Sequence, residues 1–460
     1  MSKITLKQAA LWCGGTVEEK YEQVTFLGAC NDTRTLQPGQ LFLALQGARD
    51  GHEFIPAALE KGAAAVLCTH KEGDYPAIVV PDVRLALGDI ARGERQRLGF
   101  RVVGVTGSVG KSTTKEMIAS VLEGTFRTAK TPVNHNNDIG MPMAILAMPE
   151  DTQVAVLEMG MNHFREMAYL SSIGQPDIAV IVNIGIAHIE FLGSQAGIRQ
   201  AKMEILEGMK PEGTLLLNGD DAMLRELPQK PQQKTVYFGA AEGCAVRCRE
   251  IVNAADGLRF RVTGAGESFS VIMNLEGKHF VSDAMAAVAV GLELGVSPEE
   301  IQRGLRKFRN LSGRQETLRA YGFTLIKDCY NAGPESMEAA LMVLGEKPGR
   351  KIAVLGDMLE LGDRAAAEHY RIGRIAAERL DYVLAYGKCA ERVIGGCITG
   401  GMKDSRAVAF TDQQAMAAEL QRIAKPGDVI LFKGSRGMHM EHVLEAFMKY
   451  EKDLNGGEPT

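Results

Sequence analysis

Residues 102–117 read VVGVTGSVGKSTTKEM: an apolar run, a loop with two glycines and a helix-forming stretch follow one another directly. The loop is close to the Walker A pattern G-x-x-x-x-G-K-[ST], but that pattern needs a glycine where this chain has Val105. The glycines instead give a shorter pattern, T-G-x-x-G-K-S, over residues 106–112. Backbone amides that converge in such a loop, and the N-terminus of the helix after it, attract anions. The stretch therefore predicts a phosphate site.

The expected nucleotide-binding residues of this loop are Thr106, Gly107, Ser108, Val109, Gly110, Lys111, Ser112 and Thr113. We expect Lys111 to reach the β- and γ-phosphates and the hydroxyl of Ser112 or Thr113 to face Mg²⁺. The alternative is a glycine-rich turn without a ligand. The apolar run before the loop and the helical stretch after it favour the phosphate site.

Around the loop, apolar runs alternate with longer helical stretches. Strands are predicted at 102–105, 154–157, 178–182 and 214–217, and helices at 111–122 and about 282–294. This alternation is typical of parallel βαβ units in a doubly wound sheet.

The chain is predicted to be an α/β protein of three domains. Residues 1–83 form a small α/β domain, residues 84–313 the central phosphate-binding domain, and residues 314–460 a second, Rossmann-like domain. The strands of this last domain are predicted at 352–355, 382–385, 408–410 and 429–432. In such sheets ligands bind beyond the carboxyl ends of the strands.

Composition narrows the function classes. A length of 460 residues fits two or three domains, and a net charge of −5 gives no reason to expect a nucleic-acid partner. No apolar run is long enough for a membrane span, and the N-terminus lacks a signal-peptide pattern, so a cytoplasmic location is expected. The eight cysteines form no C-x-x-C pair and are expected to be reduced.

Two candidate metal ligands follow neighbouring predicted strands. Glu158 comes directly after the run 154–157, and His188 lies just beyond the run 178–182. Both are expected at the same sheet edge as the phosphate loop, where with Ser112 they would hold Mg²⁺. Singly, a strand-end glutamate is more often solvated and a lone histidine more often hydrogen-bonded. Their joint placement favours the metal site.

The loop, Glu158, His188 and then Lys202 in the stretch AKME resemble the ATP-dependent Mur ligases of peptidoglycan synthesis. The chain resembles in particular those members that add D-alanyl-D-alanine to UDP-N-acetylmuramoyl-tripeptide, and the similarity covers essentially its whole length. The stretches that carry this likeness are residues 32–34, 38–42, 47–54, 131–137 with Gly140 and Pro142, 327–336, 354–362 with His369, and 433–436.

The resemblance implies a reaction and the residues that perform it. ATP would phosphorylate the terminal carboxylate of the UDP-muramoyl tripeptide, and the amine of D-alanyl-D-alanine would displace the phosphate. The implied cofactors are ATP and Mg²⁺, with two ions expected, and carbamylation of Lys202 by CO₂ is implied as well. From spacing alone Lys202 would be a solvated helix lysine. Lys111, Lys202, His188 and Glu158 are the implied catalytic residues.

The resemblance also assigns binding residues outside the loop. Asn137 and Arg314 are implied at the nucleotide, and Thr33 and Arg34 at the uridine diphosphate end, with Arg49 and His52 as weaker candidates. The residues implied at the incoming dipeptide, the peptide stem or a phosphate are Asp328, Tyr330, Asn331, Ser336 and Lys433. Closure of the last domain on the central one is expected to complete the site.

Four positions depart from the family pattern. Members commonly have G-x-H-N-x-x-N before the alanine-rich helix, whereas this chain has Phe280 and Asp283 in place of the asparagines. This difference puts asparagine contacts to adenine in question. Cys329 and Gly333 replace an acidic residue and an asparagine near the expected dipeptide site.

Three alternatives remain at this point. A P-loop kinase or NTPase would use the same Lys111 and Ser112. A sister Mur-type ligase would act on the UDP-muramoyl dipeptide or on folate, although the D-N-P-R segment of the enzyme that adds the third residue is absent. A non-catalytic Mur-like partner with a four-cysteine ribbon ranks lowest, because Cys244 and Cys248 have no second close pair. A monomer is expected.

Overall fold

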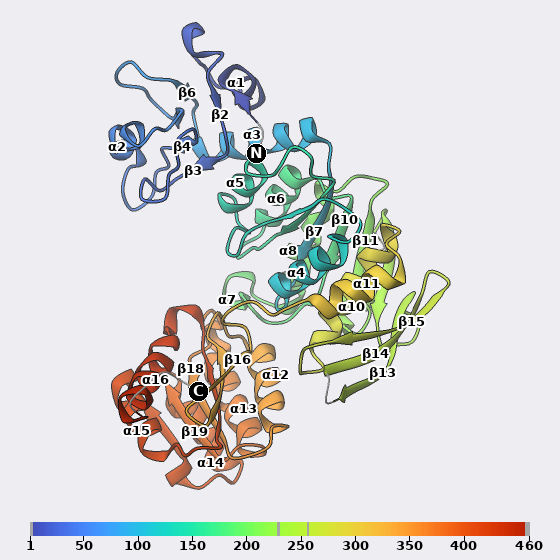
Figure 1. Cartoon of the computed structure of the whole chain (residues 1–460), viewed down its shortest axis with the longest axis vertical. Coiled ribbons are helices and arrows are strands. Elements are labelled where there is room, and N and C mark those ends of the chain that lie inside the picture. The colour runs from blue at the N-terminus through green and yellow to red at the C-terminus, as the bar shows by residue number, and fades with distance from the viewer. Residues whose placement is uncertain (1–2, 228–230, 255–256, 456–460) are drawn as a thin grey trace.

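The computed structural model describes residues 3–227, 231–254 and 257–455 and confirms the three-domain α/β fold. The three bodies form a crescent, with the central one at its back and the first and last at its tips (Figure 1). Within the described residues, no helix is long and apolar enough to cross a membrane.

The first body holds a small parallel sheet in the order β3-β4-β5-β6 and an antiparallel pair, β1 and β2. Its strands are β1 (Ile4–Thr5), β2 (Thr25–Phe26), β3 (Ala29–Cys30), β4 (Leu41–Leu43), β5 (Ala65–Cys68) and β6 (Ala77–Val79). Its helices are α1 (Leu6–Cys13), η1 (Glu19–Tyr21), η2 (Gly51–Phe54) and α2 (Ile55–Glu60). α3 (Val83–Leu98) leads into the central body and starts where the Asp82 carboxylate accepts bonds from two backbone amides.

The central sheet has nine strands in the order β15-β14-β13-β12-β11-β10-β7-β9-β8. Strands β8 to β13 are parallel where they pair, and β13, β14 and β15 add an antiparallel edge. The strands are β7 (Arg101–Thr106), β8 (Thr128–Lys130), β9 (Val154–Glu158), β10 (Ile178–Ile181), β11 (Thr214–Asn218), β12 (Lys234–Gly239), β13 (Val246–Ala254), β14 (Gly257–Gly264) and β15 (Glu267–Met273).

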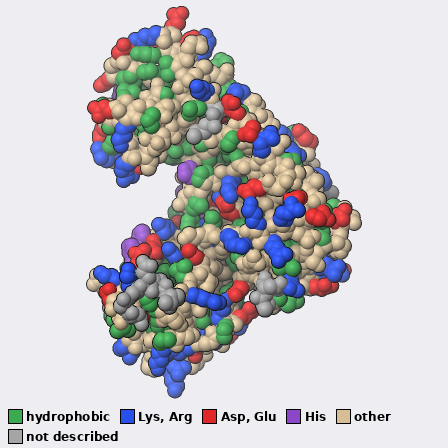
Figure 2. Space-filling model, viewed as in Figure 1, with side chains coloured by type: hydrophobic (Ala, Val, Ile, Leu, Met, Phe, Trp, Pro, Cys, Tyr) green, Lys and Arg blue, Asp and Glu red, His purple; other side chains and the backbone are tan. Residues whose placement is uncertain are grey.

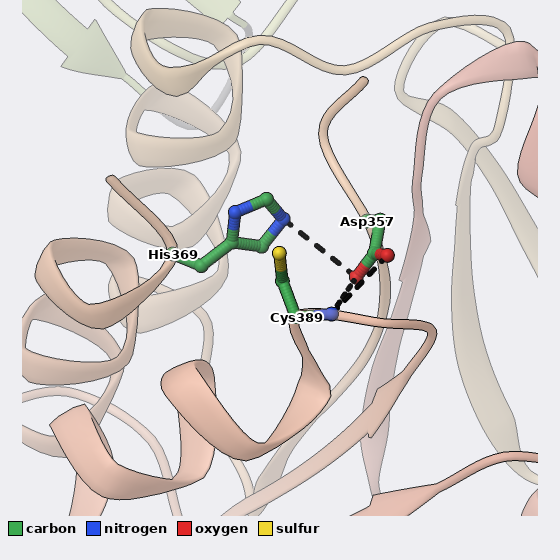
Figure 3. Close-up of side chains that lie close together, drawn as sticks. All are labelled: Asp357, His369 and Cys389. Carbon is green, nitrogen blue, oxygen red and sulfur yellow. Dashed lines mark hydrogen bonds and ion pairs between the residues drawn. The ribbon is translucent and has the colours of Figure 1, made fainter. Parts of the chain in front are cut away.

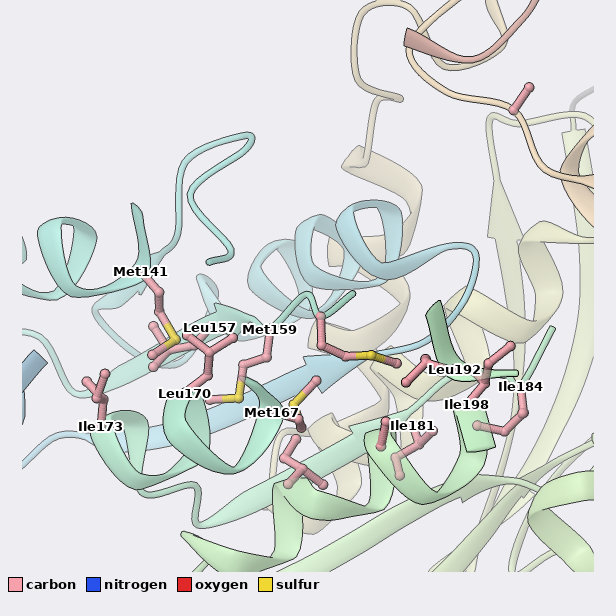
Figure 4. Packing of buried hydrophobic residues seen from close by; sticks show 14 of the residues in the cluster. Met141, Leu157, Met159, Met167, Leu170, Ile173, Ile181, Ile184, Leu192 and Ile198 are labelled. Atoms are coloured by element: carbon pink, nitrogen blue, oxygen red, sulfur yellow. The ribbon is translucent and has the colours of Figure 1, made fainter. Parts of the chain in front are cut away.

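Helices cover both faces of this sheet. They are α4 (Lys111–Leu122), α5 (Gly140–Leu146), α6 (Glu166–Gly174), α7 (Ile189–Leu192), α8 (Gln195–Met203), η3 (Glu204–Glu207), α9 (Ala222–Arg225), α10 (Phe280–Glu293) and α11 (Pro298–Lys307). Neighbouring residues of β9 belong to opposite cores: Val156 lies on the side of α4, and Leu157 packs near α5 and α6. Figure 4 shows Leu157 beside Met141 of α5 and Leu170 of α6. Burial on both faces explains why these strands read as continuous apolar runs.

The four predicted central strands and both predicted helices are confirmed within one or two residues, but four further strands lie between β11 and α10. β14 alternates buried Leu258, Phe260 and Val262 with exposed residues. Burial at every second residue indicates a strand with one face in solvent. This strand was missed because the sequence was searched for βαβ alternation of fully apolar strands.

The last body has six strands, not four, in the order β16-β17-β21-β18-β19-β20. The four predicted strands are β18 (Lys351–Gly356), β19 (Tyr382–Tyr386), β20 (Ala407–Phe410) and β21 (Val429–Lys433); β16 (Glu316–Ala320) and β17 (Phe323–Asp328) are additional. The helices are α12 (Pro334–Gly345), η4 (Gly362–Arg364), α13 (Ala365–Ala377), α14 (Ala390–Thr399), η5 (Asp404–Arg406), α15 (Gln413–Ile423), η6 (Arg436–Met438) and α16 (Glu441–Asn455). β17 and β21 pair in parallel, which puts Asp328 opposite Lys433.

Arg95 fastens α3 to the central sheet. Its buried guanidinium donates to the carbonyl oxygens of Gly174 (3.0 Å) and Gln175 (3.1 Å) and pairs with Asp177 at 3.3 Å. Removal of this side chain would leave the carbonyl oxygens of Gly174 and Gln175 without this donor, whereas Asp177 would keep the Val102 amide and Lys210. We expect Arg95→Ala to lower the free energy of unfolding by about 3 kcal/mol in chemical denaturation. Arg92→Ala on the same helix removes a more exposed pair with Asp89 and should cost under about 1 kcal/mol. Equal losses in the two variants would contradict this account.

Candidate active site

A cavity of about 850 Å³ lies between the central and last bodies. The crescent is hollowed on the side between its two tips (Figure 2). Of the predicted residues, those that line the cavity are Ser108, Val109, Gly110, Lys111, Ser112, Thr113, Asn137, Glu158, His188, Arg314, Asp328, Tyr330, Asn331, Ser336 and Lys433. Residues distant in the sequence therefore meet in one chamber.

The phosphate loop is held by Asn183, which follows β10. Its Oδ1 accepts bonds from the amides of Ser108 (3.0 Å) and Val109 (2.9 Å), and its Nδ2 donates to the Val109 carbonyl. Gly110 then turns with φ +86°, a left-handed conformation that favours glycine, and α4 starts without a side-chain cap. The uncapped first turn of α4 leaves its amides available to an anion at the cavity wall.

Lys111 lies back over the loop. Its Nζ donates to the carbonyl oxygens of Gly107 (2.8 Å) and Ser108 (3.3 Å). Burial lowers the pKa of Lys111, while Glu158 raises it and Arg314 lowers it further. The charged head therefore sits within the cavity wall, beside the helix N-terminus.

Glu158 ends β9 as a buried carboxylate. Asn136 donates to its Oε1 at 2.9 Å, but Oε2 is buried without a hydrogen-bond partner, and the nearest cation is Lys115 Nζ at 3.9 Å. An uncompensated buried carboxylate oxygen is costly unless a further cation binds it. Lys115 itself donates to the Thr131 carbonyl at 2.7 Å, so its position is fixed.

His188 starts α7 in the left-handed conformation, with φ +65°. Its Nδ1 lies 2.7 Å from Oε2 of Glu360, which belongs to the last body. The pKa of Glu360 is lowered, first by this histidine, and the charge of Lys111 lowers it as well.

Lys202 lies in α8 and is 1% exposed. Burial holds its pKa well below the usual value, and the charge of Lys111 lowers it further. Among the described residues, no carboxylate pairs with its ammonium group. It is therefore not the solvated helix lysine that spacing alone suggests.

The last body contributes a second group of side chains. Arg314 donates to Ser112 Oγ at 2.9 Å and lies over the ring of Tyr330, 4.0 Å from the centroid. The Tyr330 hydroxyl in turn donates to Asn134 of the central body. Lys433 pairs with Asp328 at 2.7 Å, and both are buried. The contacts of Arg314 and Tyr330 join the two bodies at the phosphate loop, whereas the Lys433–Asp328 pair lies within the last body.

Three predicted binding residues also hold the backbone. Ser336 exchanges hydrogen bonds with Gly333 and so caps α12. The side-chain oxygens of Asn137 and Asn331 accept bonds from nearby amides, those of Gly140 and Ala332. Each residue therefore shapes the cavity wall, and any contact with a ligand would come in addition.

Thr33 and Arg34 lie in the first body and do not line this cavity. Arg34 is an exposed guanidinium paired with Asp32 at 2.6 Å, and the Thr33 carbonyl accepts a bond from Lys61. The structure does not bring these residues to the phosphate loop. Arg49 pairs with Glu53, and His52 is held between Asp50 and Thr69.

Two of the four departures from the family pattern, Phe280 and Asp283, lie beside the loop. Asp283 accepts a bond from Thr114 at 2.9 Å, and its Oδ1 is 2.4 Å from where a side chain at Gly110 would begin. Burial raises the pKa of Asp283 to about 7, although Thr114 and Arg314 act in the opposite direction. Phe280 packs tilted against His279, with ring centroids 4.1 Å apart. Burial lowers the pKa of His279 to about 4.

A group with the composition of a metal site lies outside the cavity. Asp357, His369 and Cys389 meet at the end of β18 (Figure 3). His369 accepts a bond from the Met358 amide at 2.9 Å, and Asp357 accepts bonds from the amides of Lys388 and Cys389. Because these hydrogen bonds engage Nε2 of His369 and both carboxylate oxygens of Asp357, the group braces the loop after β18.

The sequence analysis missed four side chains of the site: Asn136, Asn183, Glu335 and Glu360. Asn136 and Glu360 lie inside the stretches 131–137 and 354–362, which carry the family likeness. Asn183 directly follows a predicted strand, the same signal that identified Glu158. Glu335 lies inside the stretch 327–336, at a position that its pattern D-x-Y-N-A-x-P-x-S leaves variable.

Asp283 gives a pH dependence of stability. Between pH 3.8 and about 7 the folded chain keeps a proton on this carboxyl that the unfolded chain has released. Stability therefore falls as pH rises through this window. We expect Asp283→Asn to gain roughly 2 to 3 kcal/mol relative to the wild type between pH 5 and pH 8 in urea denaturation. The exposed control Asp404→Asn should show no such trend. A difference that is independent of pH would contradict the assignment.

Comparisons with known proteins agree with this geometry. A model of the Mur ligase middle domain matches residues 105–291, and the Mur ligase, glutamate ligase domain matches residues 313–436. A model described as Mur ligase family, catalytic domain, matches residues 23–95. These matches cover parts of all three bodies.

Full-length relatives are similar throughout. UDP-N-acetylmuramoyl-tripeptide--D-alanyl-D-alanine ligase of Bacillus subtilis is 40% identical, over 97% of this chain and 98% of its own. The protein of that name in Escherichia coli is 35% identical, over 98% and 99%.

Solved structures give the same result. MurF from Acinetobacter baumannii superposes with a TM-score of 0.90 at 33% identity, covering 98% of this chain and 99% of its own. MurF ligase from Thermotoga maritima in complex with ADP gives 0.82 at 30% identity, covering 93% and 98%. The family models match all three bodies, and the relatives are similar along the whole chain. The protein therefore belongs to the Mur ligase family.

Proposed function

We propose that this protein is an ATP-dependent ligase that joins D-alanyl-D-alanine to UDP-N-acetylmuramoyl-tripeptide through an acyl phosphate. The observation that carries the proposal is the single cavity in which the phosphate loop, buried Glu158 and side chains of the last body meet. Relatives named for this reaction are similar over the whole chain. The side chains that the last body brings to the phosphate loop favour a ligase, which must bind a second substrate there, over a kinase.

The phosphates of ATP would bind at the uncapped N-terminus of α4. Lys111 would exchange its loop carbonyl partners for the β- and γ-phosphates, and Arg314 would exchange Ser112 for a phosphate oxygen. Both side chains are already at the cavity wall, so the electrostatic environment is largely preorganised.

The residues present fit Mg²⁺. Glu158 Oε2 is a buried oxygen without a partner, and the Ser112 hydroxyl lines the same cavity. Oxygen donors of this kind are what Mg²⁺ prefers, and His188 would be the third protein ligand. When bound, the metal would neutralise the phosphoryl oxygens during transfer. Two ions remain our expectation.

Lys202 has the chemistry for carbamylation. A buried amine with a lowered pKa is neutral more often, and a neutral amine adds to the carbon of CO₂ with loss of one proton. The resulting carbamate is anionic, which would relieve the repulsion between Lys202 and Lys111. We therefore propose that carbamylated Lys202 acts as a negatively charged positioner.

The reaction would proceed in two displacements. The tripeptide carboxylate attacks the γ-phosphorus and ADP leaves; the dipeptide amine then attacks the acyl carbon and phosphate leaves. Neutralisation of charge by Lys111 and Arg314 would bring the anionic carboxylate and ATP together. Closure of the last body would keep water from the acyl phosphate.

The remaining substrate contacts divide among the three bodies. We propose that residues 1–83 hold the UDP end through Thr33 and Arg34, residues 84–313 bind the nucleotide with Asn137 nearby, and residues 314–460 bind the dipeptide. Asp328, Tyr330, Asn331 and Ser336 would bind the dipeptide or the peptide stem, and Lys433 would close over nucleotide or phosphate; all five line the cavity. A monomer in the cytoplasm fits a reaction whose partners are all small molecules.

The amine that the enzyme accepts as its second substrate tests the proposed function. With UDP-N-acetylmuramoyl-tripeptide and ATP, we expect D-alanyl-D-alanine to give an amide product by mass analysis, with one ADP for each amide. Lys111→Ala should lose at least about a thousandfold in rate, because it removes the main cation at the transferred phosphoryl group, and should keep its circular dichroism.

The exposed control Lys307→Ala should retain its rate. Equal use of single amino acids would favour a sister ligase, and a phosphorylated product without an amide would favour a kinase. Either result, or a fully active Lys111→Ala variant, would refute the proposed function.

A further inference from the structure

Two glutamates of the last body reach a loop of the central body. The loop comprises residues 183–188 and runs from the end of β10 to His188. Oε1 of Glu335 accepts a bond from the Ile186 amide at 3.0 Å, and Oε2 of Glu360 lies 2.7 Å from Nδ1 of His188. Neither glutamate was identified from the sequence.

The same loop is bonded to the phosphate loop at its other end. Asn183 braces Ser108 and Val109, and the amide of Gly185 donates to Ser108 Oγ at 2.9 Å. Residues 183–188 therefore connect the two glutamates of the last body to the residues that shape the nucleotide site.

Glu360 has an unusual backbone. Its φ is +64°, a left-handed conformation that glutamate rarely adopts. The segment before it is fixed: His369 accepts the Met358 amide at 2.9 Å, and Ser435 Oγ accepts the Leu359 amide at 2.9 Å. A disfavoured backbone held by its surroundings points to a functional reason for the direction of this side chain.

Glu335 approaches the loop closely. It lies in the first turn of α12, which Ser336 caps, and its Oε1 is 2.6 Å from where a side chain at Gly185 would begin. The loop therefore accommodates this carboxylate because position 185 is glycine.

We propose that Glu335 and Glu360 form a clamp that positions His188, so that docking of the last body completes the nucleotide site. Oε2 of Glu360 lies within ion-pair distance of the buried Nδ1 of His188, which makes no hydrogen bond among the described residues, so this close contact limits how the ring can turn. The Ile186 contact fixes the backbone that carries this ring. Both glutamates act through His188 and its loop, and the proposal rests on the proposed ligase function.

If the two glutamates form this clamp, phosphoryl transfer depends on them and ATP binding does not. The phosphate loop and its Asn183 brace belong to the central body alone, so ATP binding does not require the two glutamates. Phosphoryl transfer requires His188 in place and therefore requires the docked last body. Loss of either carboxylate should lower kcat and leave the KM for ATP nearly unchanged.

The experiment combines kinetics with hydrogen exchange. In Glu335→Ala and Glu360→Ala we expect kcat for amide formation to fall about 10- to 100-fold, with the KM for ATP within about twofold. By mass spectrometry, the peptide containing residues 183–188 should exchange faster than in the wild type, while that of residues 102–117 should not change. Glu360→Gln keeps an oxygen acceptor and should recover most of the protection.

Glu338→Ala is the matched control, because it removes another ion-paired carboxylate of α12 that faces Arg371 (2.6 Å) and not the loop. It should match the wild type in both readouts. Unchanged kcat and unchanged exchange in both alanine variants of the clamp would overturn the proposal, as would a rise in the KM for ATP as large as the fall in kcat. A wild type that forms no amide would instead refute the proposed function, and the exchange result would still test the clamp.

Discussion

The hydrogen bonds between Asn183 and the phosphate loop are the interaction on which the site depends. They fix Ser108 and Val109 from inside the protein, so the loop keeps its shape without a nucleotide. Gly110 can then turn in the left-handed conformation and start α4 with a free N-terminus. Two amides of the loop donate to Asn183 and are not available to a ligand. The free amides of the first turn of α4 therefore form the anion site.

Burial of charge around this loop accounts for much of the chemistry. Glu158, Lys202 and Asp283 are buried, and Lys111 is half-buried in the cavity wall. Burial lowers the pKa of Lys111 and Lys202 and raises that of Asp283. Glu158 retains an unpaired oxygen, and Lys202 has no carboxylate partner among the described residues. Such groups destabilise a fold that has no ligand for them, and they make binding of a cation, an anion or CO₂ favourable.

The chain's sequence was sufficient for the parts that local chemistry determines. Glycines, a lysine and a hydroxyl between a strand and a helix identified the phosphate loop, and strand-end positions identified Glu158 and His188. Contacts between distant segments were not predictable. Glu335 and Glu360 belong to the last body, and they contact the loop of residues 183–188 only because the last body docks on the central one. Strands β14 and β15 were missed because one face is solvated and buried residues recur at every second position, unlike in the fully buried strands of the same sheet. The spacing of its helix alone favoured a solvated Lys202, and only the tertiary structure shows that this side chain is buried.

The central claim is that the carboxylate of the tripeptide attacks ATP directly. A tripeptide substrate labelled with ¹⁸O in its terminal carboxylate tests this most directly, because the carboxylate oxygen that bonds to phosphorus leaves with the phosphate. The account predicts that the released inorganic phosphate carries one ¹⁸O for each amide formed. Unlabelled phosphate released while amide forms, with the lost ¹⁸O found in water instead, would contradict it.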